Sequence, residues 1–381
     1  MRIIVLLGIV SLFADITYEG ARSIIGPYLL FLGAGAREVG FISGLGELFG
    51  FSFRFLGGYL ADRLRSYWGV TIIGYILNLF SVPLLGVTRS LGFASALVFT
   101  ERLGKAIRAP ARDTIISFAV KEKKIGTAFG IHEALDQIGA IGGPLLTALA
   151  IYVWNDMRDA FLLLFIPALF SIFFLFFAWM DFKDKKVIEV DKKVKIPIKL
   201  EKSFTLYLLG ACFFAAGFCD FPIVAYHLKK VSVVSSPFIP IFYAFAMAVD
   251  GISAFFLGRF YDRFGIKIFS ISIFISASSP FFLFLGDSVT TLLGILLWGI
   301  GMGAQESLIR AHVAKITPQC LRGTAYGIFN ALFGFSWFLG SALIGFLYEF
   351  SILWLILFTS FFQLLSLPFL YLAQPTKKEE L

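Results

Sequence analysis

The sequence predicts an all-α integral membrane protein, with twelve transmembrane helices in two pseudo-symmetric six-helix bundles. Composition is the first reason: 58% of the 381 residues are hydrophobic and 15% are charged, whereas soluble domains have roughly 45–50% and about 25%. The second reason is a series of apolar stretches long enough to cross a bilayer, and the third is a repeat that relates the two halves of the chain. A soluble globular enzyme, a disordered chain and a coiled coil are therefore excluded.

Twelve stretches have the length of about 20 mostly apolar residues that a spanning helix needs. The predicted spans are residues 4–32, 38–60, 68–88, 92–116, 126–154, 160–181, 204–228, 237–259, 268–286, 290–314, 323–348 and 352–373. The first span contains charged residues and no small-residue cleavage site, so we interpret it as a retained helix rather than a removable signal. A polar, lysine-rich linker is predicted at 182–203, between a bundle at 1–181 and a bundle with a short tail at 204–381.

The distribution of positive charge predicts the orientation in the plasma membrane. If the N-terminus is placed inside, most lysines and arginines outside the spans fall on the cytoplasmic side, as the positive-inside rule requires. Both termini and the linker are therefore predicted to be cytoplasmic. The formal net charge of +8 then reflects membrane topology, and no nucleic-acid partner is predicted.

Two pairs of segments match at nearly one separation. Residues 126–131 read GTAFGI and residues 323–328 read GTAYGI, 197 positions apart. Residues 58–63 and 258–263, 200 positions apart, share their first glycine and their final Asp-Arg. Matches of glycine and charge at nearly constant separation indicate that a six-helix unit was duplicated, and membrane transporters are commonly built from such repeats.

The second pair of segments resembles the signature loop of the major facilitator superfamily, roughly G-x-L-A-D-R-x-G-R-[RK]. The segment 258–267 keeps most of the motif, while 58–65 keeps its first part and has Arg65 in place of the second glycine, which predicts a weaker turn. The resemblance covers the full chain. It implies two six-helix bundles with a substrate site between them, and it implies that a monomer suffices.

The fifth span carries a partial match to the antiporter motif of the same superfamily. Gly139, Gly143 and Pro144 fit G-x-x-x-G-P-x-x-G-G, whereas Thr147 and Ala148 replace its last two glycines. This resemblance favours, without requiring, exchange of a substrate against protons.

The Asp-Arg pairs predict a gate at the cytoplasmic helix ends. A carboxylate there can accept hydrogen bonds from free N–H groups of a neighbouring helix, and the arginines can pair across the bundle. Contacts that form in one transporter state and break in the other act as a gate. The plainer alternative is that Asp-Arg only ends a helix. The predicted gating residues are Gly58, Asp62, Arg63, Gly258, Asp262 and Arg263.

Ionisable residues inside spans are costly and usually mark function. Carboxylates outnumber cations within the predicted spans, so some are available to bind protons or a cationic substrate. Helical spacing places the charges of the first, fourth and fifth spans on faces about 60°, 120° and 100° wide. The candidates for substrate binding and proton coupling are Asp15, Glu19, Arg22, Arg102, Lys105, Arg108, His132, Glu133, Asp136, Asp220, Glu306 and Arg310.

Glu19 and the group His132, Glu133 and Asp136 are predicted to carry the coupling proton, and a static ion-pair network is the alternative. The sequence His132-Glu133-Ala134-Leu135-Asp136 is similar to the H-E-x-x-H helix of zinc proteases, but Asp stands where the second His belongs. No resident metal is predicted, and divalent-metal transport remains a minor alternative. No nucleotide-binding G-x-x-x-x-G-K-[ST] occurs, so ATP is not predicted to be the energy source, and no cofactor is predicted.

Asp220 lies two residues before Pro222 in the seventh span. Because proline lacks a backbone donor, it can open a spanning helix. Broken helices recur at substrate sites, so Asp220 is the main candidate of the second half. A simple kink is the alternative.

Together these features predict a secondary active transporter that works by alternating access, not an enzyme. Its partners are a small-molecule substrate, protons and the lipid bilayer. Proton-coupled efflux of small organic or amphipathic compounds is favoured. Uptake or exchange of an anionic metabolite bound by the cations of the fourth span is the first alternative, and a non-transporting membrane sensor or scaffold is the second.

Overall fold

The computed structural model describes residues 2–119, 125–182, 202–317 and 322–373, and all regular elements in these ranges are helices. Most of the predicted linker lies outside the described residues, as do the side chains of Asp262 and Arg310. The helices are α1 (Arg2–Phe31), α2 (Ala36–Leu64), α3 (Tyr67–Val87), α4 (Leu91–Phe118), α5 (Ile125–Trp154), α6 (Met157–Leu163), α7 (Phe165–Phe182), α8 (Lys202–Gly217), α9 (Phe221–Lys230), α10 (Phe238–Phe264), α11 (Ile266–Leu285), α12 (Ser288–Ile316), α13 (Arg322–Phe350) and α14 (Ile352–Leu372).

Each predicted span corresponds to helix, which confirms the all-helical fold class. Two spans are interrupted: the sixth consists of α6 and α7, and the seventh of α8 and α9. Within the described residues, eleven helical stretches are long and apolar enough to cross a membrane. The span α4 is absent from that set because it carries charged residues through much of its length.

The chain divides into two compact units. The first unit comprises Met1–Ala34, Phe49–Lys192 and Leu228–Ala244, and the second comprises Gly35–Leu48, Lys193–His227 and Phe245–Leu381. The first unit therefore contains α1, α3 to α7 and most of α2. The predicted domain boundaries at 181 and 204 stay a prediction.

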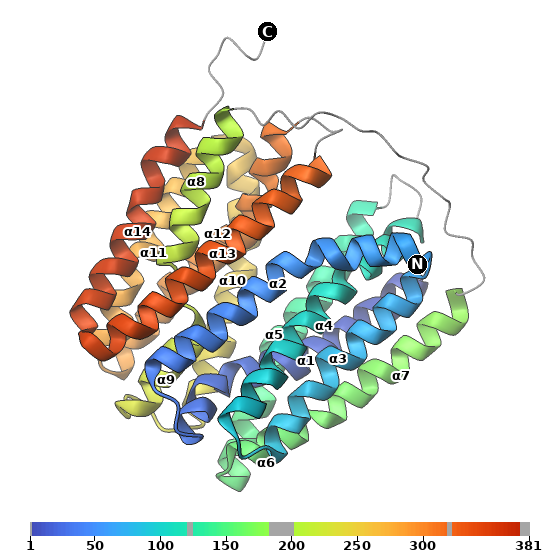
Figure 1. Cartoon of the computed structure of the whole chain (residues 1–381), viewed down its shortest axis with the longest axis horizontal. Helices are drawn as coiled ribbons and strands as arrows, with labels where there is room; N and C mark the ends of the chain where they lie inside the picture. The colour runs from blue at the N-terminus through green and yellow to red at the C-terminus, as the bar shows by residue number, and fades with distance from the viewer. Residues whose placement is uncertain (1, 120–124, 183–201, 318–321, 374–381) are drawn as a thin grey trace. The chain divides into compact units, whose positions relative to one another are not determined.

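Close helix packing in the first unit depends on small residues. The helix α1 packs along α5 and α7, and α3 packs along α4 (Figure 1). A methyl group on Gly143 of α5 would lie 2.8 Å from the backbone nitrogen of Gly20 on α1. Likewise, a methyl group on Gly104 of α4 would lie 2.9 Å from Cα of Asn78 on α3. Membrane helices associate through such close contacts of small residues, because no hydrophobic driving force acts between helices in lipid.

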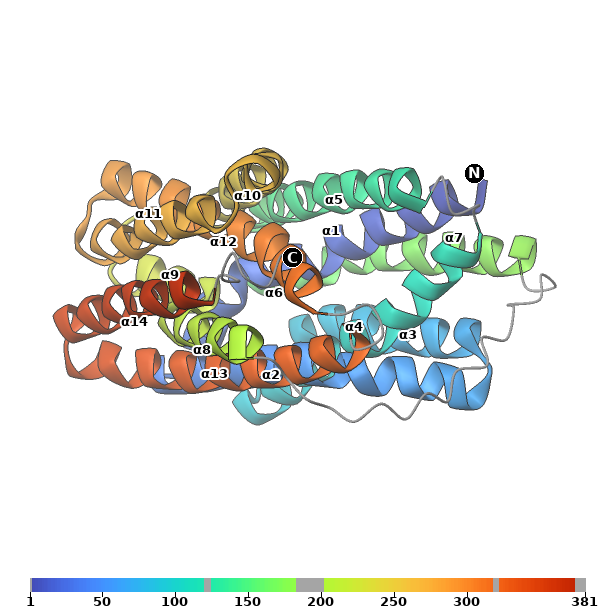
Figure 2. The ribbon, with the colours of Figure 1, turned by 90° about the horizontal axis from the view of Figure 1, so that it is seen from above.

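In the second unit, α8 runs beside α13 and α14, and α11 runs beside α12 and α14 (Figure 2). Hydrogen bonds from serine hydroxyl groups connect these helices. Ser276 donates to Oε1 of Gln363 at 2.8 Å, and Ser360 donates to the carbonyl of Ala277 at 2.7 Å. These hydrogen bonds satisfy buried polar groups inside the bilayer, where no water is available to do so.

Candidate functional site

A polar core lies inside the first unit, among α1, α3, α4 and α5. The helix α1 supplies Asp15, Glu19 and Arg22, whose side chains share a face and are 6%, 7% and 9% exposed. The helix α4 supplies cations from the facing side. The three charged residues that helical spacing places on one face of α1 are therefore buried together.

The first part of this core is the Glu19 cluster, formed by Glu19, Lys105, Tyr18 and Tyr243. The Nζ atom of Lys105 lies 3.5 Å from Oε1 of Glu19 and 3.8 Å from the centre of the Tyr18 ring. The Tyr243 hydroxyl, from the segment Leu228–Ala244 of the same unit, donates to Oε2 of Glu19 at 2.6 Å. Both oxygens of this buried carboxylate are thus engaged.

A small cavity lies next to the Glu19 cluster. Its polar lining comes from Tyr18, Arg22, Glu101 and Arg102, and its volume is about 30 Å³, enough for about two water molecules. Arg102 Nε lies 3.4 Å from Oε2 of Glu101, and the Asn78 amide donates to Oε1 of Glu101 at 2.7 Å. The cavity is therefore bordered by a carboxylate already held by a cation and an amide.

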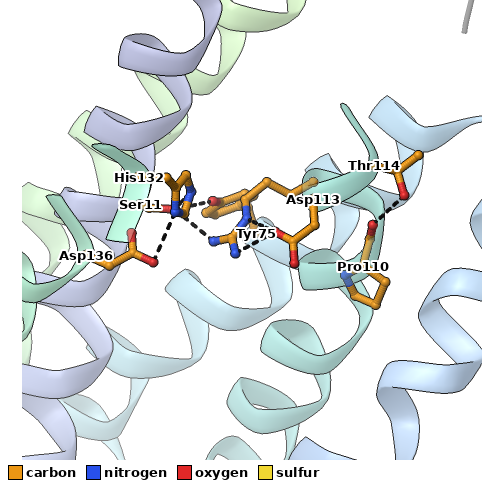
Figure 3. A network of polar contacts seen from close by, with 8 residues as sticks. Ser11, Tyr75, Pro110, Asp113, Thr114, His132 and Asp136 are labelled. Atoms are coloured by element: carbon orange, nitrogen blue, oxygen red, sulfur yellow. Dashed lines mark hydrogen bonds and ion pairs between the residues drawn. The ribbon is translucent and has the colours of Figure 1, made fainter. Parts of the chain in front are cut away.

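The second part is the His132 network, formed by His132, Asp136, Ser11, Tyr75 and Arg112 (Figure 3). The His132 ring is 3% exposed; its Nδ1 lies 3.3 Å from Oδ2 of Asp136, and its Nε2 lies 2.9 Å from the Ser11 hydroxyl. That hydroxyl is 3.2 Å from the Tyr75 hydroxyl and accepts from Nη1 of Arg112 at 2.9 Å. Hydrogen bonds thus connect α1, α3, α4 and α5.

Arg112 joins the His132 network to the end of α4. Its Nε and Nη2 donate to Oδ1 of Asp113 at 3.0 and 2.9 Å. Two residues before Arg112, Pro110 lies inside the helix and cannot donate a backbone hydrogen bond. The Thr114 hydroxyl donates to the Pro110 carbonyl at 2.8 Å, as Figure 3 shows. The helix α4 therefore lacks one backbone hydrogen bond close to Arg108 and Arg112.

Asp15 and Arg108 occupy the space between the two clusters. The Arg108 side chain is 1% exposed, and its guanidinium carbon lies 4.1 Å from the centre of the Tyr75 ring and 5.7 Å from that of Tyr18. In the described part of the chain, Nε and Nη1 of Arg108 and Oδ1 of Asp15 are buried without a hydrogen-bond partner. Each of these two charges thus keeps unused hydrogen-bonding capacity.

The structure places Glu133 apart from its predicted group, since this residue is exposed on α5 whereas His132 is buried. Among the described residues, no group of three or more His, Cys, Asp or Glu side chains is arranged to hold a metal ion.

In the second unit, the predicted break before Pro222 is confirmed. The chain leaves helical conformation between Gly217 and Phe221, and Asp220 is 2% exposed with Oδ1 accepting from the Phe221 nitrogen at 3.0 Å. Two neighbours hydrogen-bond to the freed carbonyls: Gln363 donates to Gly217 at 3.1 Å, and Trp298 donates to Cys219 at 2.7 Å. Glu306, the other described candidate of this unit, is exposed.

The predicted gating residues of the first unit make local contacts. Asp62 accepts from the Tyr67 hydroxyl at 2.6 Å rather than from a backbone N–H, and Arg63 donates to the Tyr59 hydroxyl at 3.2 Å. A methyl group on Gly58 would lie 3.6 Å from Cβ of Pro110, in ordinary contact.

In the second unit, the Arg263 guanidinium lies 5.2 Å from the Phe264 ring centre. A methyl group on Gly258 would meet no described atom within 4 Å. The gating role stays a prediction for both loops.

Sequence reasoning missed the uncharged members of the core. They are Ser11, Tyr18, Tyr75, Asn78 and Tyr243, and Glu101 was also left out of the predicted site. The sequence contained a signal for Ser11 and Tyr18. Together with Asp15 and Arg22 they occur at spacings of four, three and four residues, which places all four on one face of a helix. No local pattern marks Tyr243, which is 224 positions from Glu19.

Comparisons with known proteins agree with this architecture. The sequence model of the Major Facilitator Superfamily matches residues 7–249 and 206–381 of this chain. An uncharacterized protein of Mycobacterium tuberculosis is 37% identical over 97% of this chain and 92% of its own length. An uncharacterized transporter of this type from Methanocaldococcus jannaschii is 27% identical over 91% of this chain and 88% of its own length.

Among solved structures, the crystal structure of the nucleoside transporter NupG matches 99% of this chain and 100% of that chain. Its TM-score is 0.76 at 16% identity, so the likeness is one of fold. With the matched family description and the helical spans, these findings identify a multi-pass membrane transporter and not an enzyme. The chain belongs to the major facilitator superfamily.

Proposed function

We propose that this protein couples transport of a small molecule to protons, and that the His132–Asp136 pair carries the coupling proton. One observation supports this most directly: a buried imidazole nitrogen lies 3.3 Å from a carboxylate oxygen inside a spanning helix. Asp136 also has a second, buried oxygen without a hydrogen-bond partner in the described part of the chain. That oxygen is a place for an additional proton.

Histidine is suited to this role because its unperturbed charge change falls between pH 5 and 8. The groups that face the pair come from every neighbouring helix: Ser11 and Asp15 from α1, Tyr75 from α3, and Arg108 and Arg112 from α4. A nearby cation favours the ionised carboxylate, and a nearby carboxylate disfavours it. A shift of α4 relative to α5 would therefore change proton binding, as alternating access requires.

Export of cationic or amphipathic compounds by proton antiport is one candidate direction. It requires a carboxylate that can receive a cation, and among the described acids of the polar core Asp15 keeps a buried oxygen without a hydrogen-bond partner. Glu19, Glu101 and Asp113 each lie within ion-pair distance of a cation.

Uptake or exchange of an anion is the second candidate, and Arg108 favours it. Three other cations of α4 lie within ion-pair distance of carboxylates, whereas Arg108 makes no ion pair or hydrogen bond with any described residue. Arginine stays charged at all accessible pH values, so this buried cation is permanently available to an anion.

Proton flux tests the proposal. Proteoliposomes containing a trapped pH dye would receive ethidium as the cation or benzenesulfonate as the anion, with protein-free liposomes as the baseline. We expect substrate-dependent proton movement in the native protein and its loss in Asp136→Asn. Asp287→Asn is the matched control, because Asp287 is an exposed helix cap and Asn caps equally well.

Two results would contradict the proposal. Unchanged proton movement in Asp136→Asn would remove this pair from the coupling path. Absence of proton movement with both probes in folded native protein would exclude proton coupling for these substrate classes and favour a sensor or scaffold.

A further inference from the structure

We propose that Arg108 is the binding residue for the substrate, and that the substrate is a small organic anion with a carboxylate group that travels together with a proton. The inference rests on the proposed transport function and specifies its substrate class and the sign of coupling. Its starting observation is the burial of Arg108 in the middle of a spanning helix with two nitrogens, Nε and Nη1, unused by the described residues.

A purely structural role does not account for Arg108. A buried charge that makes no ion pair is destabilising because it has lost its hydration, and each buried donor without a hydrogen-bond partner adds to that cost. The neighbouring Lys105 and Arg112, one turn away on either side, both lie within ion-pair distance of carboxylates. Arg108 is thus the exception on this face, which is typical of a group whose partner is a ligand.

The aromatic rings beside Arg108 fix its position without consuming its donors. The guanidinium carbon lies 4.1 Å from the Tyr75 ring centre and 5.7 Å from that of Tyr18. Ring contacts engage the face of a guanidinium, whereas its N–H groups project from its edge. A planar carboxylate can accept two parallel hydrogen bonds from that edge. Two tyrosine rings nearby also favour an organic rather than an inorganic anion.

Two carboxylates near Arg108 determine whether proton binding strengthens or weakens anion binding. Asp15 and Asp136 both lie within electrostatic range of Arg108, although neither is within ion-pair distance of it. While both are ionised, they repel an incoming anion and offset the arginine charge. When a proton neutralises one of them, less of the arginine charge is offset and the anion is attracted more strongly. Proton binding and anion binding therefore favour each other, which is the requirement for symport.

Proton balance in this step is simple. A proton from solution binds a carboxylate oxygen, for which the buried Oδ1 atoms of Asp15 and Asp136 are available. The anion binds the Arg108 N–H groups without covalent change. Both leave on the opposite side of the membrane, so one anion and one proton cross together and the net charge moved is zero.

Anion-dependent thermal stability of the purified full chain tests the inference. The probes are benzoate, inorganic phosphate and benzenesulfonate at constant ionic strength, with chloride as the reference anion. We expect benzoate to raise the unfolding temperature of the native protein, more at pH 5.5 than at pH 8. In Arg108→Gln we expect binding to weaken about tenfold to a hundredfold, the range for hydrogen bonds to a charged group.

Two further variants separate geometry from charge. Arg108→Lys keeps the charge but not the planar donor edge, so it should recover only part of the binding. Arg158→Gln removes a partly exposed arginine that pairs with Asp156 and should bind benzoate as the native protein does.

Four outcomes would overturn the inference. They are equal stabilisation of native protein and Arg108→Gln, no stabilisation of native protein by any probe, a preference for phosphate over benzoate, and stronger benzoate binding at pH 8 than at pH 5.5. None of them depends on Asp136→Asn. Loss of proton flux in Asp136→Asn without anion binding at Arg108 would leave the proposed function standing and remove this inference alone.

Discussion

Arg65 and Gly265, 200 positions apart in the repeat, both have a positive backbone φ, of 50° and 62°. The loop of the first half therefore turns at the same position as the loop of the second half, although it lacks the glycine there. The expected weaker turn appears as backbone strain, since a left-handed non-glycine residue costs roughly 1–2 kcal/mol. The turn itself is kept.

The first prediction follows from this pair. Gly265→Ala should destabilise the protein by about 1–3 kcal/mol, because the backbone at φ 62° and ψ −144° lies in a region that only glycine adopts readily, although no described atom lies near the added Cβ. The matched control is Gly258→Ala, also in open space but inside the helix α10, where alanine should be neutral or gain up to about 1 kcal/mol. Thermal unfolding in detergent would measure both. Equal effects of the two substitutions would show that φ is not the cause.

The second prediction concerns Ser11, whose hydroxyl joins His132, Arg112 and Tyr75. Ser11→Ala should cost about 1–3 kcal/mol, because it leaves buried polar groups without their partner, and it should slow proton-coupled transport. Tyr75→Phe removes one longer hydrogen bond of 3.2 Å and keeps the ring beside Arg108, so its cost should be smaller. Unfolding temperature and proton flux measured on the same samples would check this, and a larger effect of Tyr75→Phe would contradict it.

The third prediction tests the close packing of α1 and α5. A methyl group on Gly143 would lie 2.8 Å from the Gly20 nitrogen, whereas one on Gly142 would lie 3.7 Å from Cγ1 of Ile16. Gly143→Ala should therefore destabilise by about 1–3 kcal/mol, the usual cost of overpacking. Gly142→Ala should be tolerated. If both alanine variants unfold at the native temperature, the two helices are not held by this contact.

The fourth prediction concerns the loop before α6. The pKa of Asp156 is lowered from its ordinary value, first by the hydrogen bond from the Arg158 side chain and also by that from its backbone nitrogen. A lowered folded-state pKa contributes stability above the unfolded value of about 3.9 that is lost as pH falls through the folded value. Asp156→Ala should therefore cost about 1 kcal/mol at neutral pH, and the difference from native protein should vanish in acid.

Its control is Ser90→Ala. Ser90 precedes α4 and makes no side-chain capping hydrogen bond, so this change should stay within about 0.5 kcal/mol. Unfolding temperatures between pH 7 and pH 3 would provide the comparison. A pH-independent difference for Asp156→Ala would mean that its charge is not what stabilises the turn.

Much of the fold could be predicted from the sequence, because the constraints that the bilayer places on a spanning helix act within one segment of the chain. A spanning segment must satisfy its own backbone hydrogen bonds, so apolar stretches predicted the positions of the spans to within a few residues, apart from α4, which carries many charges. The break in the seventh span was also predictable, since Pro222 lacks the donor that a continuous helix needs. Helical spacing gathered Asp15, Glu19 and Arg22 on one buried face.

The sequence by itself thus determined the helices, their repeat and which faces carry charge, because these depend on residues a few positions apart. Only the tertiary structure decided which charges pair. It brought His132 to Ser11 across 121 positions and Tyr243 to Glu19 across 224, and it placed neighbouring Glu133 at the surface. It also left Arg108 buried between two tyrosine rings without a described ion pair. Pairing depends on how helices from distant segments pack, and no pattern within one segment contains that information.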